Sequence, residues 1–308
     1  MITSYPDELV KYVLHIPLRM PPHQGFFNFG PDQTLLGYQA GVTFEGPYVY
    51  LRLEDVPSDD IEKKLDAVRR CLAWAAVRLD QGIVASNAQL RYAEAGLFDG
   101  QGPTAFPVGL QARPLRIEGS HRSEEPSTRL FAALNEGAQQ TPVITEAPES
   151  KLLLACEIFA AVDFESSVNA QFLAFTMVLE VLAAPKERPP VCVDLVDDLL
   201  KQTHALKFSA DEELKSALNS LQESAKWLKK ESITGSIRML ARKTAVALGD
   251  ADPSQAAKAA GSLYGKRSQL VHFGKSVAHA DVHQMRRLAR ECLAVEMGCF
   301  HSIRERYP

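Results

Sequence analysis

The sequence has no long hydrophobic run and few cysteines. No stretch approaches the roughly 18 consecutive apolar residues that a membrane span needs, and the first residues lack the basic and apolar segments of a signal peptide. The cysteines are scattered and none forms a Cys-x-x-Cys pair, which argues against a structural zinc site. We therefore expect a cytoplasmic protein without a membrane segment, with reduced and mostly buried thiols at Cys71, Cys156, Cys192, Cys292 and Cys299.

Positive charge is scarce in the first half of the chain and gathers near the C-terminus. The formal net charge is −4. Residues 1–150 contain 13 Lys and Arg against 19 Asp and Glu, whereas residues 266–306 contain 8 against 4. A local excess of positive charge favours a polyanionic partner, although an ordinary solvated helix face can have the same composition.

Residues 1–145 alternate strand-like and helical patterns, which predicts a mixed α/β domain. The role of this domain is open between sensing, regulation and partner binding. One helix is expected at 60–81, with Asp59 as its N-cap and an apolar stripe along one side. Polar segments at 118–127 and 137–150 flank a short helix at 128–135 and mark the domain boundary. Strands are expected at 10–16, 41–44, 48–53, 89–93 and 106–117.

Residues 150–308 have helical periodicity almost throughout. Short loops between the helices predict antiparallel neighbours and hence an all-α bundle, so the overall fold class is α+β. The segment that includes Phe172–Leu182 is the most apolar and is expected to be a buried central helix. Asp281 is expected to be the N-cap of the last helix. The expected helices span 150–162, 165–184, 193–204, 210–230, 234–248, 254–273 and 281–305.

Three segments of this half resemble one known family. The first is the apolar helix from Phe172 that ends in a Leu-Glu-x-Leu pattern around Glu180, and the second is 230–238. The third is 263–272, in which Arg267 and His272 are separated by four residues. Together these segments are similar to the HEPN superfamily of ribonucleases, in particular its ApeA-like branch, over about residues 150–308. The resemblance implies a HEPN-like helical domain with Arg267 and His272 as its catalytic pair.

The residue types fit RNA cleavage without a metal or other cofactor. In such a reaction the neighbouring 2′-hydroxyl attacks the phosphate, one proton leaves that hydroxyl, and another reaches the departing 5′-oxygen. A histidine, with an ordinary pKa of about 6.5, can accept or donate a proton near neutral pH. An arginine remains charged and can hold two phosphate oxygens. DNA lacks the 2′-hydroxyl and would not react in this way.

The resemblance also implies partners and supporting residues. It predicts a homodimer or higher oligomer that acts as a toxin or anti-phage effector on RNA, with an antitoxin or a phage-derived trigger. Family members usually place Asn, Asp or His after the arginine, whereas this chain has Ser268, which can still orient a neighbour by a hydrogen bond. Glu180 is expected to support Arg267. Further candidate phosphate contacts are Lys266, Lys275, Arg286, Arg287 and Arg290.

Several alternatives stay open. The bundle can instead be a non-catalytic protein-interaction or dimerisation module, in which Arg267 pairs with a carboxylate such as Glu180 and His272 is half-buried. A metal hydrolase could use His279 and His283, although Asp281 between them looks like an N-cap and no third ligand is evident. The Arg-x4-His spacing also occurs at 116–121, but we discount that copy because it lies in a Gly/Ser loop. The glycines of 25–30 fit the pattern of a phosphate-binding loop poorly.

Overall fold

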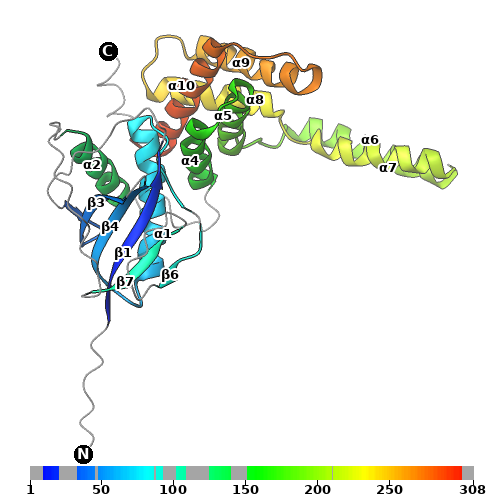
Figure 1. Ribbon diagram of the computed structural model, residues 1–308. Coiled ribbons are helices and arrows are strands. Elements are labelled where there is room, and N and C mark those ends of the chain that lie inside the picture. The colour runs from blue at the N-terminus through cyan, green and yellow to red at the C-terminus, as the bar shows by residue number, and fades with distance from the viewer. Residues whose placement is uncertain are drawn as a thin grey trace, which may run out of the picture.

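The computed structural model describes residues 10–20, 33–45, 48–86, 88–92, 102–108, 125–139, 151–209 and 211–299. The segments 25–30 and 116–121, and the expected strand beyond 108, lie outside these residues. Within them the chain is α+β: a small mixed sheet with two helices is followed by a group of helices (Figure 1).

The strands belong to one sheet in the order β2-β3-β4-β1-β7-β6, and β5 pairs with the far end of β1. All pairs are antiparallel except the parallel pair of β6 and β7. The expected strands at 10–16, 41–44 and 48–53 are confirmed, and each is longer than its pattern predicted. The strands are β1 (Lys11–Arg19), β2 (Gln33–Leu35), β3 (Tyr38–Glu45), β4 (Tyr48–Pro57), β5 (Val84–Ala85), β6 (Arg91–Tyr92) and β7 (Thr104–Pro107).

Two helices, α1 (Ile61–Leu79) and α2 (Glu125–Gln139), cover one face of the sheet. Leu14 and Ile16 of β1 point toward them because alternate residues of a strand face the same side. His15 lies on the other face, against Tyr50 and Phe106. The expected helix at 60–81 is confirmed as α1, except that Asp60 rather than Asp59 is its N-cap.

The C-terminal half is helical, as expected, and its central helix α5 buries Phe172 and Phe175. Asp281 is not an N-cap: the last helix begins at His279, two residues earlier than expected. The helices are α4 (Lys151–Ala161), α5 (Val168–Leu182), α6 (Pro190–Leu206), α7 (Glu212–Trp227), α8 (Ile233–Ala247), α9 (Pro253–Phe273) and α10 (His279–Glu296), with short 3-10 turns at Val162–Phe164 and Lys207–Ser209.

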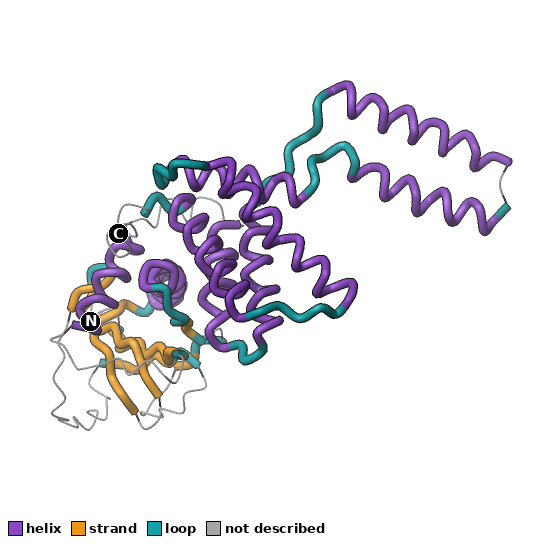
Figure 2. Tube along the Cα trace, turned by 90° about the horizontal axis from the view of Figure 1, so that it is seen from above, coloured by secondary structure: helices purple, strands orange, loops and turns teal. Residues whose placement is uncertain are grey.

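Helix α1 lies between the sheet and the bundle and belongs to two hydrophobic cores (Figure 2). Val68 and Leu72 pack toward the sheet. Trp74 and Val77 belong to the core of the bundle, where α1 packs against α4 and α10. Helix α1 therefore contributes to both cores. By contrast, α6 and α7 project away from the bundle as a pair (Figure 1).

Two further expectations concern the thiols and the membrane. All five cysteines are free, and Cys71, Cys156, Cys292 and Cys299 are buried whereas Cys192 is half-buried. Burial raises the pKa of the Cys71 thiol to about 11, so this thiol stays protonated near neutral pH. Among the described residues, no helix is both long and apolar enough to cross a membrane.

Candidate functional site

Helix α9 carries the Arg-x4-His motif in its last turns. It begins where the Asp252 side chain accepts hydrogen bonds from the backbone N–H groups of Ser254 (3.1 Å) and Gln255 (2.9 Å), with Pro253 in its first turn. It ends at Gly274, whose φ of +65° is the left-handed conformation that glycine adopts at little cost. The expected helix at 254–273 is thus confirmed, and His272 lies in its final turn.

Glu180 of α5 connects the motif to the bundle. Its Oε1 accepts a hydrogen bond from the Tyr264 hydroxyl at 2.7 Å and lies 3.5 Å from Nε of Arg267. Burial and this hydrogen bond raise the pKa of Tyr264 to about 12, so the phenol remains a donor. Among the described residues Glu180 is the ion-pair partner of Arg267, whose side chain is 34% exposed. The guanidinium is therefore oriented from one side and accessible from the other.

Ser268 and His272 are both exposed. They are four residues apart on α9 and therefore share one face of the helix. Arg267 is five residues from His272, a rotation of about 140° about an ideal helix axis. The alternative interpretation is thus right that Arg267 pairs with Glu180, but wrong that His272 is half-buried.

The loop from α9 to α10 is fixed by Asn169, which sequence reasoning missed. The Asn169 Oδ1 accepts from the backbone N–H of Val277 at 3.1 Å, and its Nδ2 donates to Oγ of Ser276 at 3.4 Å. No local pattern reveals these contacts because Asn169 is more than 100 residues away in the sequence. Lys275, one of the expected phosphate contacts, is exposed on this loop.

Lys266 has a partner within the protein. Its Nζ lies 2.5 Å from Oδ1 of Asp281, and Oδ2 of Asp281 accepts a hydrogen bond from the backbone N–H of Ala278. These contacts, led by the bond from Lys266, lower the pKa of Asp281 below its ordinary value. The Lys266 side chain is still 42% exposed, so it can contribute charge at the surface but is tethered to the start of α10.

Arg286 has a structural position rather than the expected contact with RNA. It donates to Asp163 and, through Nε at 2.8 Å, to Oδ1 of Asp80, and its guanidinium also lies against the rings of Phe159 and Phe175. All of these partners are internal, so Arg286 is removed from the candidate phosphate contacts.

Arg290 is similarly engaged and Arg287 is not. Arg290 is buried and donates to the Val77 carbonyl at 3.1 Å and to the Arg78 carbonyl at 3.3 Å, so it too is removed from that set. Arg287, one residue from Arg286, is highly exposed and pairs with Glu291 on its own helix.

The geometry does not support the alternative of a metal hydrolase that uses His279 and His283. His279 is in the first turn of α10, not in the loop, and His283 follows one turn later. Within the described residues, no group of three His, Cys, Asp or Glu side chains is arranged to hold a metal ion.

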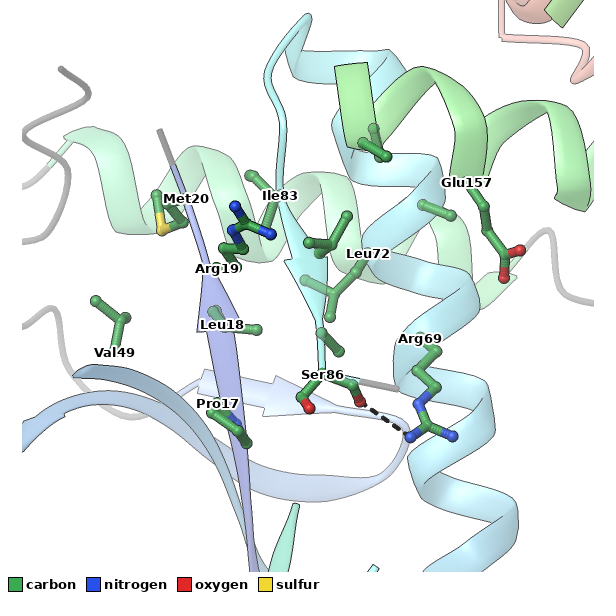
Figure 3. Close-up of a pocket in the computed structure, with 15 residues that line it drawn as sticks. Pro17, Leu18, Arg19, Met20, Val49, Arg69, Leu72, Ile83, Ser86 and Glu157 are labelled. Atoms are coloured by element: carbon green, nitrogen blue, oxygen red, sulfur yellow. Dashed lines mark hydrogen bonds between the residues drawn. The ribbon is translucent and has the colours of Figure 1, made fainter. Parts of the chain in front are cut away.

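A cavity of about 700 Å³ lies away from α9, between β1, β5, α1 and α4 (Figure 3). Arg19, Arg69 and Glu157 lie at its wall, and Arg69 donates to the Ser86 carbonyl at 3.0 Å. Burial raises the pKa of the Glu157 carboxyl, while Arg69 lowers it in part. None of the expected site residues lines this cavity, so it does not join the candidate site.

The candidate site therefore consists of Arg267, Ser268 and His272 at the end of α9, with Glu180 beside Arg267 and with Lys266 and Lys275 on the same helix and the loop that follows it. Arg287 lies further along α10 and interacts with Asp250, just before the start of α9. No family model, curated protein or solved structure matches the chain.

Proposed function

We propose that the protein is a metal-independent endoribonuclease of the HEPN type. The observation that carries this proposal is the placement of the motif: His272 and Ser268 are open to solvent on one helix face, and Arg267 is held by Glu180 with part of its guanidinium accessible. His272 and Arg267 provide a proton carrier and an anion-binding group five residues apart on one helix.

In the proposed reaction the 2′-oxygen of RNA bonds to phosphorus while the bond to the 5′-oxygen breaks. The products are a 2′,3′-cyclic phosphate and a 5′-hydroxyl. His272 transfers the protons as general acid/base, and Arg267 stabilises the negative charge that builds on the phosphate oxygens. Ser268 orients His272 or the phosphate through its hydroxyl. Lys275 and Arg287 attract the RNA backbone and act mainly through charge.

The site is proposed to be completed by a second copy of the chain. Arg267 and His272 point to different sides of α9, so one helix alone does not direct both at a single phosphate. Two copies of α9 that face one cleft can place the arginine of one copy near the histidine of the other. In this proposal the N-terminal half restrains or triggers the nuclease, in response to an antitoxin or a phage-derived signal.

The proposal is tested by incubating the purified protein with total RNA, with and without EDTA. We expect cleavage that survives the chelator, is lost in His272→Ala and is strongly reduced in Arg267→Ala. His283→Ala is the matched control, because it removes an exposed histidine from the neighbouring helix. Cleavage that stops with EDTA, or that depends on His283 and not on His272, would refute the proposal.

A second candidate function is a non-catalytic interaction module. It is favoured by the two residues that flank His272: Val271 is 49% and Phe273 is 75% exposed. Exposed apolar side chains at one helix end are typical of a protein contact. In that case Phe273→Ser would abolish an association, and no variant of His272 would change the integrity of RNA.

A further inference from the structure

The helices α6 and α7 form an arm that leaves the bundle (Figures 1 and 2). The base of the arm is closed by two backbone hydrogen bonds, from Arg188 to the Lys229 carbonyl and from Glu231 to the Lys186 carbonyl, each 2.8 Å long. An ion pair of 2.6 Å joins Asp197 of α6 to Lys229, two residues after the end of α7. The arm is thus an antiparallel helix pair with a defined connection to the body.

The arm carries more apolar surface than its two helices bury. Along the line where they meet, the buried side chains are Val196 and Thr203 of α6 and Leu218 and Ala225 of α7. Beside this line, each helix has a second apolar stripe whose residues are 39–67% exposed. We call these residues the apolar face: Val191, Leu195, Leu199, Leu206, Leu214, Leu221 and Leu228.

The two stripes lie on the same side of the arm. Successive residues of a helix are turned by about 100° around its axis, so the direction of each apolar stripe can be compared with that of the buried side chains. Viewed along the chain direction of each helix, the α6 stripe is displaced from Val196 in the same sense as the α7 stripe is displaced from Leu218. For two antiparallel helices that face each other, equal senses of rotation lead to one common face. The opposite side is polar, with a groove lined by Leu200, Lys201, His204, Gln222 and Lys226.

We propose that the apolar face is covered by the same face of a second copy of this chain, which produces an antiparallel four-helix bundle. The helices of the arm have 17 and 16 residues, so two arms match in length. Their common face is about 24 Å long and about 20 Å wide from helix dimensions. Its accessible surface is comparable with the roughly 800 Å² per partner of a standard interface.

The face is complementary to itself. Leu214, Leu221 and Leu228 are seven residues apart, a spacing that keeps them on one seam. A two-fold rotation through the middle of the arm brings Leu221 against its own copy and Leu214 against Leu228 of the second copy. The apolar face contains no Lys or Arg, which makes it unsuited to nucleic acid.

The charged side chains of α6 lie away from the apolar face and have partners within the chain. Lys201 lines the polar groove and pairs with Asp198, and Asp197 pairs with Lys229. Covering the apolar face therefore buries none of these ion pairs. The arm is proposed to hold together the same two copies that complete the nuclease site, and molar mass tests this interface without a measurement of RNA cleavage.

The test is the molar mass of the full chain in solution, measured by light scattering over a series of concentrations. We expect a dimer for the wild type and a monomer for Leu195→Glu/Leu221→Glu, with unchanged far-ultraviolet circular dichroism because both positions are exposed. Val246→Glu, which changes an exposed apolar residue of α8, is the control and should remain dimeric. A wild type that stays monomeric would overturn the proposal, as would a dimer that resists the arm variant or is broken by Val246→Glu.

Oxidative cross-linking checks the two-fold arrangement. Leu221→Cys should form a covalent dimer well above the wild-type background, because the residue meets its own copy. Leu214→Cys alone should not, but a mixture of Leu214→Cys and Leu228→Cys should. Absence of a covalent dimer from Leu221→Cys would contradict the proposed arrangement.

Discussion

Arg286 donates its Nε–H to Oδ1 of Asp80 at 2.8 Å, although the two residues are 206 positions apart. Asp80 follows the last residue of α1, and its φ of +57° places it in the left-handed conformation. The second carboxylate that Arg286 holds, Asp163, also accepts from the backbone N–H of Gly82 at 2.6 Å. One guanidinium therefore fixes the bundle to the end of the helix that supports the sheet.

Arg286→Ala should destabilise the protein by about 3 kcal/mol, because it leaves the partly buried Asp163 carboxylate without its charged partner and leaves Asp80 with Arg290 at 3.5 Å. The measurement is the free energy of unfolding from urea titration. Arg287→Ala is the matched control, since this neighbouring side chain is 81% exposed, and it should change stability by less than about 1 kcal/mol. Equal effects of the two variants would contradict the role of Arg286.

Gly82→Ala and Gly265→Ala should have opposite effects on stability. A Cβ at position 82 would lie 2.6 Å from Cβ of Asp163 and 2.9 Å from the Ala160 carbonyl oxygen, so the substitution should cost about 1–3 kcal/mol. A Cβ at position 265 meets no atom within 4 Å, and alanine should stabilise α9 by up to about 1 kcal/mol. Thermal unfolding of both variants measures this difference. A Gly82→Ala protein as stable as the wild type would show that Gly82 does not lie this close to Asp163 and Ala160.

Stability should fall as the pH decreases because of His15. Burial, with a smaller contribution from Arg52, lowers the pKa of the His15 imidazole from 6.5 to about 3. Between these values the unfolded chain binds a proton that the native state excludes, so the native state loses stability as the pH falls below about 6.5.

The variant His15→Phe should remove this dependence. Between pH 6.5 and about pH 5, the free energy of unfolding should decrease less for this variant than for the wild type. The difference between the two decreases should be up to about 2 kcal/mol. His283→Gln, at an exposed position, should keep the wild-type slope. Identical slopes for His15→Phe and the wild type would mean that His15 can be protonated in the native state.

Glu180→Gln should reduce RNA cleavage without unfolding the bundle. Glutamine can still accept the Tyr264 hydrogen bond but no longer attracts Arg267, so the guanidinium loses its orientation. We expect a loss of roughly tenfold in kcat with little change in KM, because Arg267 is proposed to act on the transition state. Glu296→Gln, which removes a carboxylate paired with Lys243 elsewhere, should leave both constants unchanged.

Local patterns predicted much of the fold. The apolar stripe of α1 and the capping residues Asp252 and Gly274 determine their helices through neighbours close in sequence, so these elements could be predicted. The start of α10 was misplaced because an acidic residue in a first turn resembles an N-cap, and Asp281 is at the third position.

Long-range contacts could not be predicted in the same way. Arg286 and Arg287 are both basic residues of one helix, and only the presence of Asp80 and Asp163 distinguishes the internal one from the exposed one. The pairing of Glu180 with Arg267 was anticipated, whereas the support from Asn169 was not, because no sequence spacing reports it.

The most direct test of the proposed nuclease is the chemical nature of the RNA ends that it produces. Total RNA is treated with wild-type protein in EDTA, and the new 3′ ends are mapped and compared with those from His272→Ala. Attack by the 2′-hydroxyl predicts 2′,3′-cyclic phosphate at these ends and none with the variant. New ends that carry a 3′-hydroxyl, or equal cleavage by His272→Ala, would contradict the account.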